Sequence, residues 1–193
     1  MLTEDKSITT PEYWAKVYTG RNENAKVDAS NTKRPANAFD RFKWLADIVD
    51  GPAVLDVASG HATTMKRLRA MHPDWDIICT DQTAEAKNAA GFSPYFIVNA
   101  YDIAYCIEKS VTTVTMSQAL EYIEFPDLFM EGVKKVADYF VCTVPEGEMQ
   151  KWSQLRIYTE DSFKAWLQTH GDIVHFDKVP SLMLAKIKLR SNG

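Results

Sequence analysis

Residues 53–62 read AVLDVASGHA, and this stretch decides the fold class. Its first half is a short apolar run around a single acid, Asp56, which predicts a strand buried on both faces of a sheet. Its second half is small or polar, and apolar residues at helical spacing follow it at Met65, Leu68 and Met71. A buried strand, a turn of small residues and a helix together predict the start of a parallel α/β sheet.

The same alternation continues along the chain. Further apolar runs predict strands at 76–80, 95–98, 111–116 and 139–144, with helices between them around 83–90 and over 126–137. Such an order gives right-handed crossovers and a mostly parallel sheet. After a helix predicted over 159–170, two strands at 172–179 and 182–190 are joined only by Pro180-Ser181, a link too short for a parallel crossover. We therefore expect a Rossmann-like α/β fold: a seven-stranded mixed sheet with an antiparallel C-terminal strand and helices on both faces.

The N-terminal region is organised differently. Thr10, Pro11 and Glu12 are typical of a helix start, and Tyr13, Trp14, Val17 and Tyr18 follow at helical spacing. Residues 19–35 are polar and predict a surface loop, whereas the apolar residues between 39 and 48 predict an amphipathic helix. We expect an N-terminal helical arm and loop over residues 1–35, with the α/β domain over residues 36–193.

The composition of the chain limits the kinds of molecule that we expect it to bind. The 193 residues carry a formal net charge of −4, so a nucleic-acid partner is disfavoured and a small-molecule substrate is favoured. No apolar stretch approaches the ~20 residues of a membrane span, and the polar start MLTEDKSITT is unlike a secretion signal. The three cysteines, at 79, 106 and 142, have no metal-ligand spacing, so reduced thiols, no metal and a cytoplasmic location are expected. The sequence leaves a monomer and a homodimer open.

Polar side chains follow several of the predicted strands. Asp56 lies at the end of the first, Asp81 follows the second, Asn99 and Asp102 follow the third, and Ser117 and Gln118 follow the fourth. Open α/β sheets bind ligands at these carboxyl ends, beside the point where the strand order reverses. A carboxylate at Asp81 could accept hydrogen bonds from both hydroxyls of a ribose, and Asn99 could bind an adenine edge. The ordered set predicts a nucleoside site.

Five segments in order resemble the class I S-adenosylmethionine-dependent methyltransferases, in particular the small type 11 and type 12 members. The family pattern V-L-D-x-G-x-G-x-G is similar to residues 54–62, and its second-strand acid is similar to Asp81. Its adenine segment D-A-x-D-L-P-F resembles residues 99–105, and its L-E-H segment resembles residues 120–126. The segment that opens the last helix resembles residues 156–163.

The resemblance implies that S-adenosylmethionine is the cofactor and that its methyl group passes to a small-molecule or glycan acceptor. It also implies a set of cofactor-binding residues that surround the methionine, ribose, adenine and methyl groups: Tyr13, Trp14, Asp56, Ala58, Ser59, Gly60, Asp81, Gln82, Asn99, Ala100, Ser117 and Gln118. Tyr13, Trp14 and Tyr18 would form a lid, since an aromatic face attracts a sulfonium cation.

The sequence departs from the family pattern at several positions. Ala58 and Ala62 replace glycines, and an alanine that must adopt positive φ there costs on the order of 1 kcal/mol. Asn99 replaces a frequent acid, and Tyr122 stands where a histidine is usual. A general base is needed only for a hydroxyl or a protonated amine, and the candidates for it are His61, Tyr122 and Glu121.

Other interpretations stay open at this stage. Asp56 could cap the turn that follows it, Asp81 could cap the next helix, and Glu121 and Glu124 could sit at a helix start. The alternative functions are an NAD-linked oxidoreductase, which would require more glycines than Gly60 in the first turn, and a catalytically silent regulatory module that binds the same cofactor.

Overall fold

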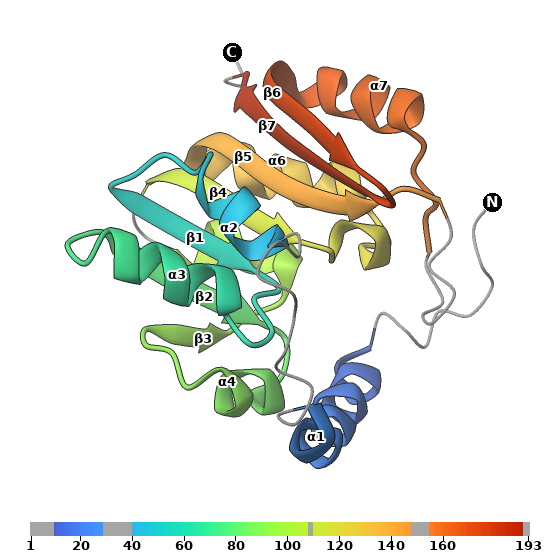
Figure 1. Ribbon diagram of the computed structural model, residues 1–193. Coiled ribbons are helices and arrows are strands. Elements are labelled where there is room, and N and C mark those ends of the chain that lie inside the picture. The colour runs from blue at the N-terminus through green and yellow to red at the C-terminus, as the bar shows by residue number, and fades with distance from the viewer. Residues whose placement is uncertain (1–9, 29–39, 108–109, 148–154, 191–193) are drawn as a thin grey trace.

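A computed structural model describes residues 10–28, 40–107, 110–147 and 155–190 of the chain. Its strands form one seven-stranded sheet in the order β3-β2-β1-β4-β5-β7-β6 (Figure 1). Strands β1 to β5 pair in parallel, whereas β7 is antiparallel to both β5 and β6. The predicted mixed sheet with an antiparallel C-terminal strand is confirmed. The strand bounds are β1 Ala53–Val57, β2 Asp76–Asp81, β3 Tyr95–Ile97, β4 Val111–Ser117, β5 Ala137–Pro145, β6 Gly171–Val179 and β7 Leu182–Leu189.

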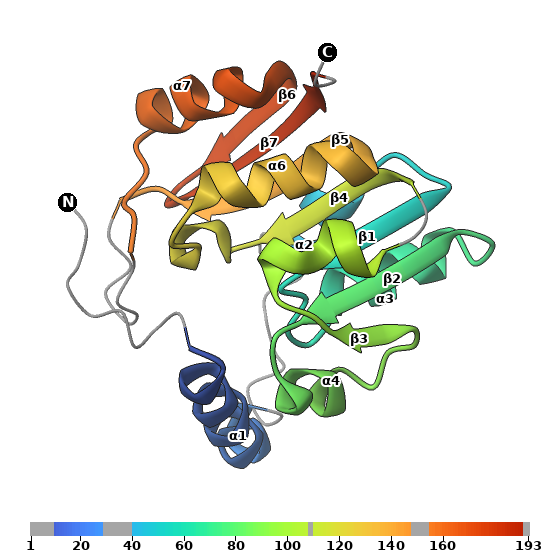
Figure 2. The ribbon, with the colours of Figure 1, turned by 180° about the vertical axis from the view of Figure 1, so that it is seen from behind.

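Helices cover both faces of the sheet, as Figures 1 and 2 show from opposite sides. One face carries α2 (Arg41–Ala46), α3 (Thr63–Met71) and α4 (Ala84–Ala90), and the other carries α5 (Ile103–Cys106), α6 (Pro126–Val136) and α7 (Glu160–His170). Each face has its own apolar cluster, because successive strand residues point to opposite sides: Val54 belongs to one cluster and Leu55 to the other. Two short 3₁₀ helices, η3 (Ala100–Asp102) and η4 (Leu120–Tyr122), follow β3 and β4.

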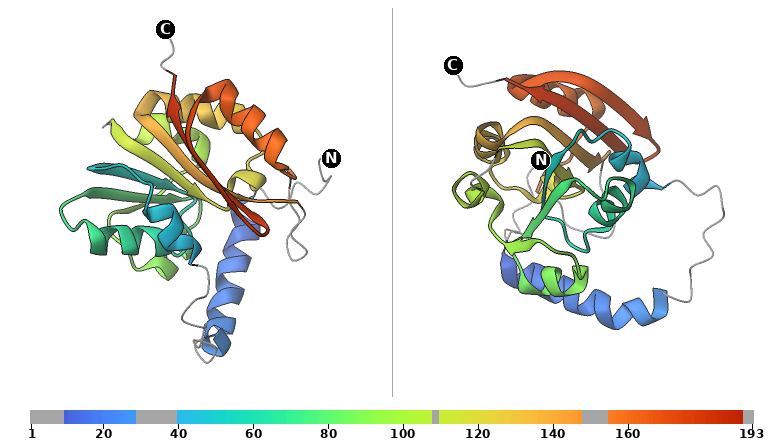
Figure 3. Two further views of the ribbon diagram at one scale, coloured as in Figure 1. Left: turned by 45° about the horizontal axis from the view of Figure 1, so that its top comes forward. Right: turned by 90° about the vertical axis from the view of Figure 1, so that its left-hand side faces the viewer.

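The first helix is longer than the sequence predicts. Helix α1 spans Pro11–Asp28, so the loop expected from residue 19 onward is wrong up to residue 28, and the rest of that prediction lies outside the described residues. The stretch is polar but contains no proline, and polarity predicts exposure rather than the absence of a helix. Helix α1 runs beside α4 and past the end of the sheet (Figure 3).

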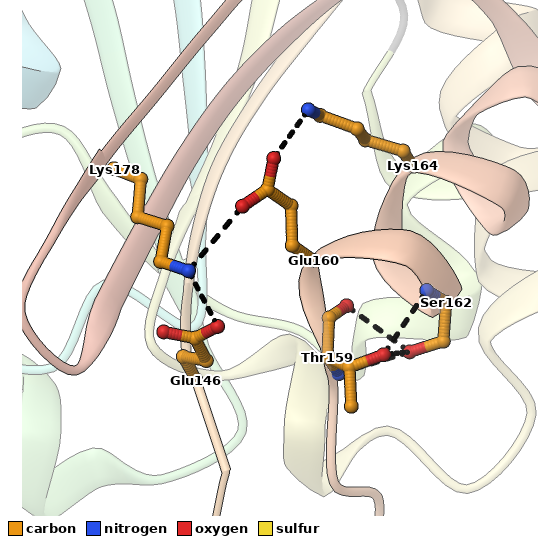
Figure 4. Close-up of polar contacts among 6 residues, drawn as sticks. All are labelled: Glu146, Thr159, Glu160, Ser162, Lys164 and Lys178. Atoms are coloured by element: carbon orange, nitrogen blue, oxygen red, sulfur yellow. Dashed lines mark hydrogen bonds and ion pairs between the residues drawn. The ribbon is translucent and has the colours of Figure 1, made fainter.

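A polar network fixes the C-terminal elements beside the end of β5. The side chain of Lys178 on β6 contacts Glu146 at 2.7 Å and Glu160 at 3.3 Å, and Glu160 also contacts Lys164 at 2.6 Å (Figure 4). Thr159 is the N-cap of α7, and its hydroxyl accepts the Ser162 N–H at 3.2 Å. These contacts join β6 to Glu146, the residue after β5, and to Glu160 at the start of α7.

Candidate functional site

A cavity of about 600 Å³ opens at the carboxyl ends of β1, β2 and β4 and beside the end of β3. It therefore lies where the strand order reverses between β1 and β4, as the sequence predicts. The structure brings together nearly all of the predicted site residues around it: Trp14, Asp56, Ala58, Ser59, Gly60, His61, Asp81, Gln82, Asn99, Ala100, Ser117, Gln118, Glu121 and Tyr122. Tyr13 is the exception. It lies outside the cavity lining, with its ring packed edge-on against Trp14.

The turn after β1 forms one wall of the cavity and has an unusual backbone. Ala58, Gly60 and Ala62 adopt left-handed φ values of 56°, 51° and 51°, so both alanines occupy positions that favour glycine. The Ser59 N–H donates to the Thr80 carbonyl at 2.9 Å, which ties the turn to β2. A Cβ at position 60 would lie 2.8 Å from the Tyr18 hydroxyl, so a side chain there would have to displace the Tyr18 ring as well as adopt a left-handed backbone.

Asp81 ends β2 and is buried at the cavity wall. Its Oδ2 accepts the Gly60 N–H at 3.1 Å and the Tyr18 hydroxyl at 3.5 Å. Burial raises the pKa of this carboxyl, opposed first by the Gly60 hydrogen bond. The alternative in which Asp81 caps the following helix is wrong, because Thr83 is the N-cap of α4 and accepts the Ala86 N–H.

Asp56 is the second buried carboxyl of the site. Its Oδ1 accepts the Thr115 hydroxyl at 2.5 Å from the neighbouring strand β4. Burial raises the pKa of Asp56 to about 6, despite the lowering effects of Thr115 and of Ser59 in the turn that follows. The Asp56 side chain therefore interacts with β4 and also with the turn. The main-chain carbonyl of Asp56 does contact the turn, since it accepts the Ser59 hydroxyl at 2.8 Å.

The segment after β3 forms a second wall of the cavity. Asn99 is the N-cap of η3, and its Oδ1 accepts the Tyr101 N–H at 3.0 Å. Asp102 lies within η3 and outside the cavity lining. Asn99 and Ala100 border the cavity beside Val98, so this wall offers main-chain groups and a short apolar surface to a flat ligand.

The segment after β4 brings charged and aromatic groups to the opposite side. Gln118 has a φ of 51°, and its side-chain oxygen accepts a hydrogen bond from Arg41 of α2. Glu121 is 0% exposed, and burial raises its pKa to about 8, opposed first by its own main-chain N–H and then by the charge of Arg41. Glu121 does lie in the first turn of a helix, but that helix is the three-residue η4, and the longer helix α6 begins only at Pro126.

Aromatic rings of α1 lie over the cavity. Trp14 packs edge-on against Tyr122 with ring centres 5.0 Å apart, and Tyr18 packs edge-on against His61 at 5.7 Å. The sequence prediction of site residues missed Arg41 and Phe42, which also line the cavity. Both come from a helix that precedes the first strand, and no local pattern indicates that Arg41 reaches a residue 77 positions away.

Two further findings concern the described residues as a whole. Within residues 10–28, 40–107, 110–147 and 155–190, no three His, Cys, Asp or Glu side chains gather closely enough to hold a metal ion. No helix in the same part of the chain is both long and apolar enough to cross a membrane.

Comparison with known proteins identifies solved structures that have a similar fold. No protein-family model and no curated protein sequence matches the chain. Solved structures do match. A SAM-dependent methyltransferase from Aquifex aeolicus is 18% identical with a TM-score of 0.64, and the match covers 86% of this chain and 98% of that one. The plantazolicin methyltransferase BamL, in complex with an analogue of desmethylPZN and SAH, is 13% identical with a TM-score of 0.65 over 95% and 97% of the two chains. The [4+2]-cyclase SpnF is 12% identical with a TM-score of 0.67 over 79% and 81%.

The chain therefore has the class I methyltransferase fold, and the fold expected from the sequence is confirmed. The presence of a [4+2]-cyclase among the similar structures shows that this fold carries more than one chemistry. The function must be argued from the cavity.

Proposed function

We propose that the cavity binds S-adenosylmethionine and that the protein transfers its methyl group to a small-molecule or glycan acceptor. The observation that carries the proposal is the position of Asp81. Its carboxylate borders the cavity between the turn after β1 and the segment after β3, where a ribose would lie if the adenine rested against Asn99 and Ala100. Two carboxylate oxygens can accept hydrogen bonds from both ribose hydroxyls.

The rest of the cavity supports the same orientation. The methionine part would lie along the turn after β1, and the sulfur would point toward Gln118 at the end of β4. Trp14 and Tyr122 would then present aromatic rings to the sulfonium cation, which a π face attracts by about 0.5–2 kcal/mol. The transfer would be an in-line displacement accelerated mainly by proximity and alignment of the two reactants.

One competing function, an NAD-linked oxidoreductase, is less well supported by the turn after β1. An NAD-linked enzyme places a pyrophosphate against a turn with several glycines, whereas here Ala58 and Ala62 bring methyl groups to that turn. A catalytically silent module that binds the cofactor shares every feature of the cofactor half. The two differ only in turnover, so an assay for methyl transfer over a panel of acceptors separates them.

Calorimetry tests the proposal. The wild-type protein should bind S-adenosylhomocysteine, and Asp81→Asn should weaken that binding at least about tenfold, because a hydrogen bond to a charged group contributes about 1.5–3 kcal/mol. Asp76→Asn is the matched control, since Asp76 lies at the other end of the same strand and outside the cavity. Absence of any heat at 1 mM S-adenosylhomocysteine, or binding of NADH in its place, would overturn the proposal.

A further inference from the structure

Glu121 is a buried acid in the wall of the cavity. Its side chain is 0% exposed and lines the cavity, yet neither carboxyl oxygen has a hydrogen-bond partner among the described residues. Burying an ionisable group in this way costs several kcal/mol unless something else satisfies it. A group of this kind in a cavity wall indicates that a ligand completes its hydrogen bonds.

The main chain around Glu121 is firmly held, so the position of the side chain is not accidental. The Glu121 carbonyl accepts the N–H groups of Leu155 and Arg156 at 3.1 and 3.2 Å, and the Arg156 side chain donates to the Glu124 carbonyl at 2.8 Å. These contacts join η4 to Leu155 and Arg156, which precede α7. The main-chain carbonyl of Glu121 is therefore hydrogen-bonded, and its carboxyl group is left to bind a ligand.

The charges around the carboxyl define which ligand it can accept. Arg41 of α2 is the cation that acts on Glu121, and its side chain also donates to Gln118. The charge of Glu121 acts in turn on Cys142 of β5 and on Tyr158. Burial, above all, raises the pKa of both groups, which keeps the thiol and the phenol neutral. To take a proton from a ligand the carboxyl must be ionised, and an ionised carboxylate only accepts hydrogen bonds. A ligand group that binds this ionised form must therefore bring an N–H or an O–H.

We propose that the Glu121 carboxylate binds the nucleophile of the methyl acceptor through its N–H or O–H, so that the acceptor is an amine or an alcohol. This inference rests on the proposed function, because it takes the segment after β4 as the wall beside the transferable methyl. Gln118 and Glu121 lie on that segment, opposite the wall formed by Asn99 and Ala100.

The chemical step balances with the groups named. A lone pair of the acceptor nitrogen or oxygen forms a bond to the methyl carbon, and the carbon–sulfur bond breaks with its electron pair retained on sulfur. S-Adenosylhomocysteine leaves as the neutral thioether. The proton on the nucleophile passes to the Glu121 carboxylate, which becomes a carboxylic acid and later returns the proton to water. Of the three base candidates, Glu121 is the one that is fully buried, and its two carboxyl oxygens have no hydrogen-bond partner among the described residues.

Sinefungin is the probe for this inference, because an amine-bearing carbon replaces the methylated sulfur and places an ammonium group where the methyl would lie. Wild-type protein should bind sinefungin at least about tenfold more tightly than S-adenosylhomocysteine at pH 7.5, since a charge-assisted hydrogen bond contributes about 1.5–3 kcal/mol. Glu121→Gln should remove most of that preference and change the affinity for S-adenosylhomocysteine less than threefold. Glu131→Gln, on α6 and outside the cavity lining, loses the same charge and should behave as wild type.

A second measurement needs no variant. Because burial raises the pKa of Glu121 to about 8, the carboxyl is mostly protonated in the empty cavity at pH 7, and an ammonium beside it favours ionisation. Calorimetry in buffers of different ionisation enthalpy should show release of nearly one proton with sinefungin and almost none with S-adenosylhomocysteine. Equal proton release with both ligands, or an unchanged sinefungin preference in Glu121→Gln, overturns the role of Glu121 alone. Failure of wild-type protein to bind either ligand overturns the proposed function instead.

Discussion

Replacing Glu121 by glutamine should stabilise the protein, and the gain should increase with pH. In the unfolded chain the carboxyl ionises near its ordinary pKa of 4.5, whereas in the fold burial raises the pKa to about 8. As the pH rises from 4.5 to 8, the unfolded state releases this proton first, so the folded state loses stability over that range. Above pH 8 both states are ionised and the loss stops. At about 1.4 kcal/mol for each pH unit, the full loss is on the order of 5 kcal/mol.

Glutamine keeps the shape of the side chain and cannot ionise, so it escapes this loss. Urea unfolding of both proteins at pH 6 and pH 8.5 measures the effect. The stability advantage of Glu121→Gln should increase by about 2–3 kcal/mol between the two pH values, which corresponds to roughly 5–10 °C in melting temperature. Asp56 and Asp81 also have raised pKa values, but both proteins retain them, so their contribution cancels in the difference. An advantage that is constant with pH, or a variant less stable than wild type at pH 8.5, would refute the reasoning.

Two further predictions concern the strained turn and its neighbour. Ala58→Gly should stabilise the protein by about 0.5–1 kcal/mol, because relief of a left-handed alanine exceeds the entropy cost of glycine. The control Ala89→Gly, within helix α4, should destabilise the protein by about 1 kcal/mol. The midpoints of denaturant unfolding measure both changes, and equal losses of stability would contradict the left-handed backbone at Ala58. Thr115→Val should cost about 1.5–3 kcal/mol because it removes a hydrogen bond to Asp56, whereas Thr113→Val removes one to a main-chain carbonyl and should cost about 1 kcal/mol. Calorimetric melting compares the two, and a larger loss for Thr113→Val would show that the Asp56 contact is unimportant.

Much of the fold follows from short-range patterns in the sequence. Buried parallel strands appear as apolar runs, and the two-residue link at Pro180 permits only an antiparallel hairpin, which the structure confirms. The glycines that Ala58 and Ala62 replace in the family pattern indicate a cost if these positions need positive φ, and both alanines do have positive φ. These features are readable because each depends on residues close together in the chain.

The features that sequence reasoning missed depend on contacts between distant segments. The Arg41–Gln118 contact joins α2, which precedes β1, to the segment after β4, and no periodicity in the sequence encodes it. The helical continuation of α1 to Asp28 was missed because polar composition predicts exposure, not backbone conformation. The burial of Glu121 without a hydrogen-bond partner among the described residues depends on the contact between η4 and the segment around Leu155. The sequence alone shows only an acid near an expected helix start, which does not predict that contact.

A crystal structure with S-adenosylhomocysteine bound is the most direct test of this account. The account predicts adenine against Asn99 and Ala100, both ribose hydroxyls on the Asp81 carboxylate, and the sulfur directed toward Gln118 and Glu121. A ligand bound in the reverse direction, or outside the cavity at the ends of β1, β2 and β4, would contradict it.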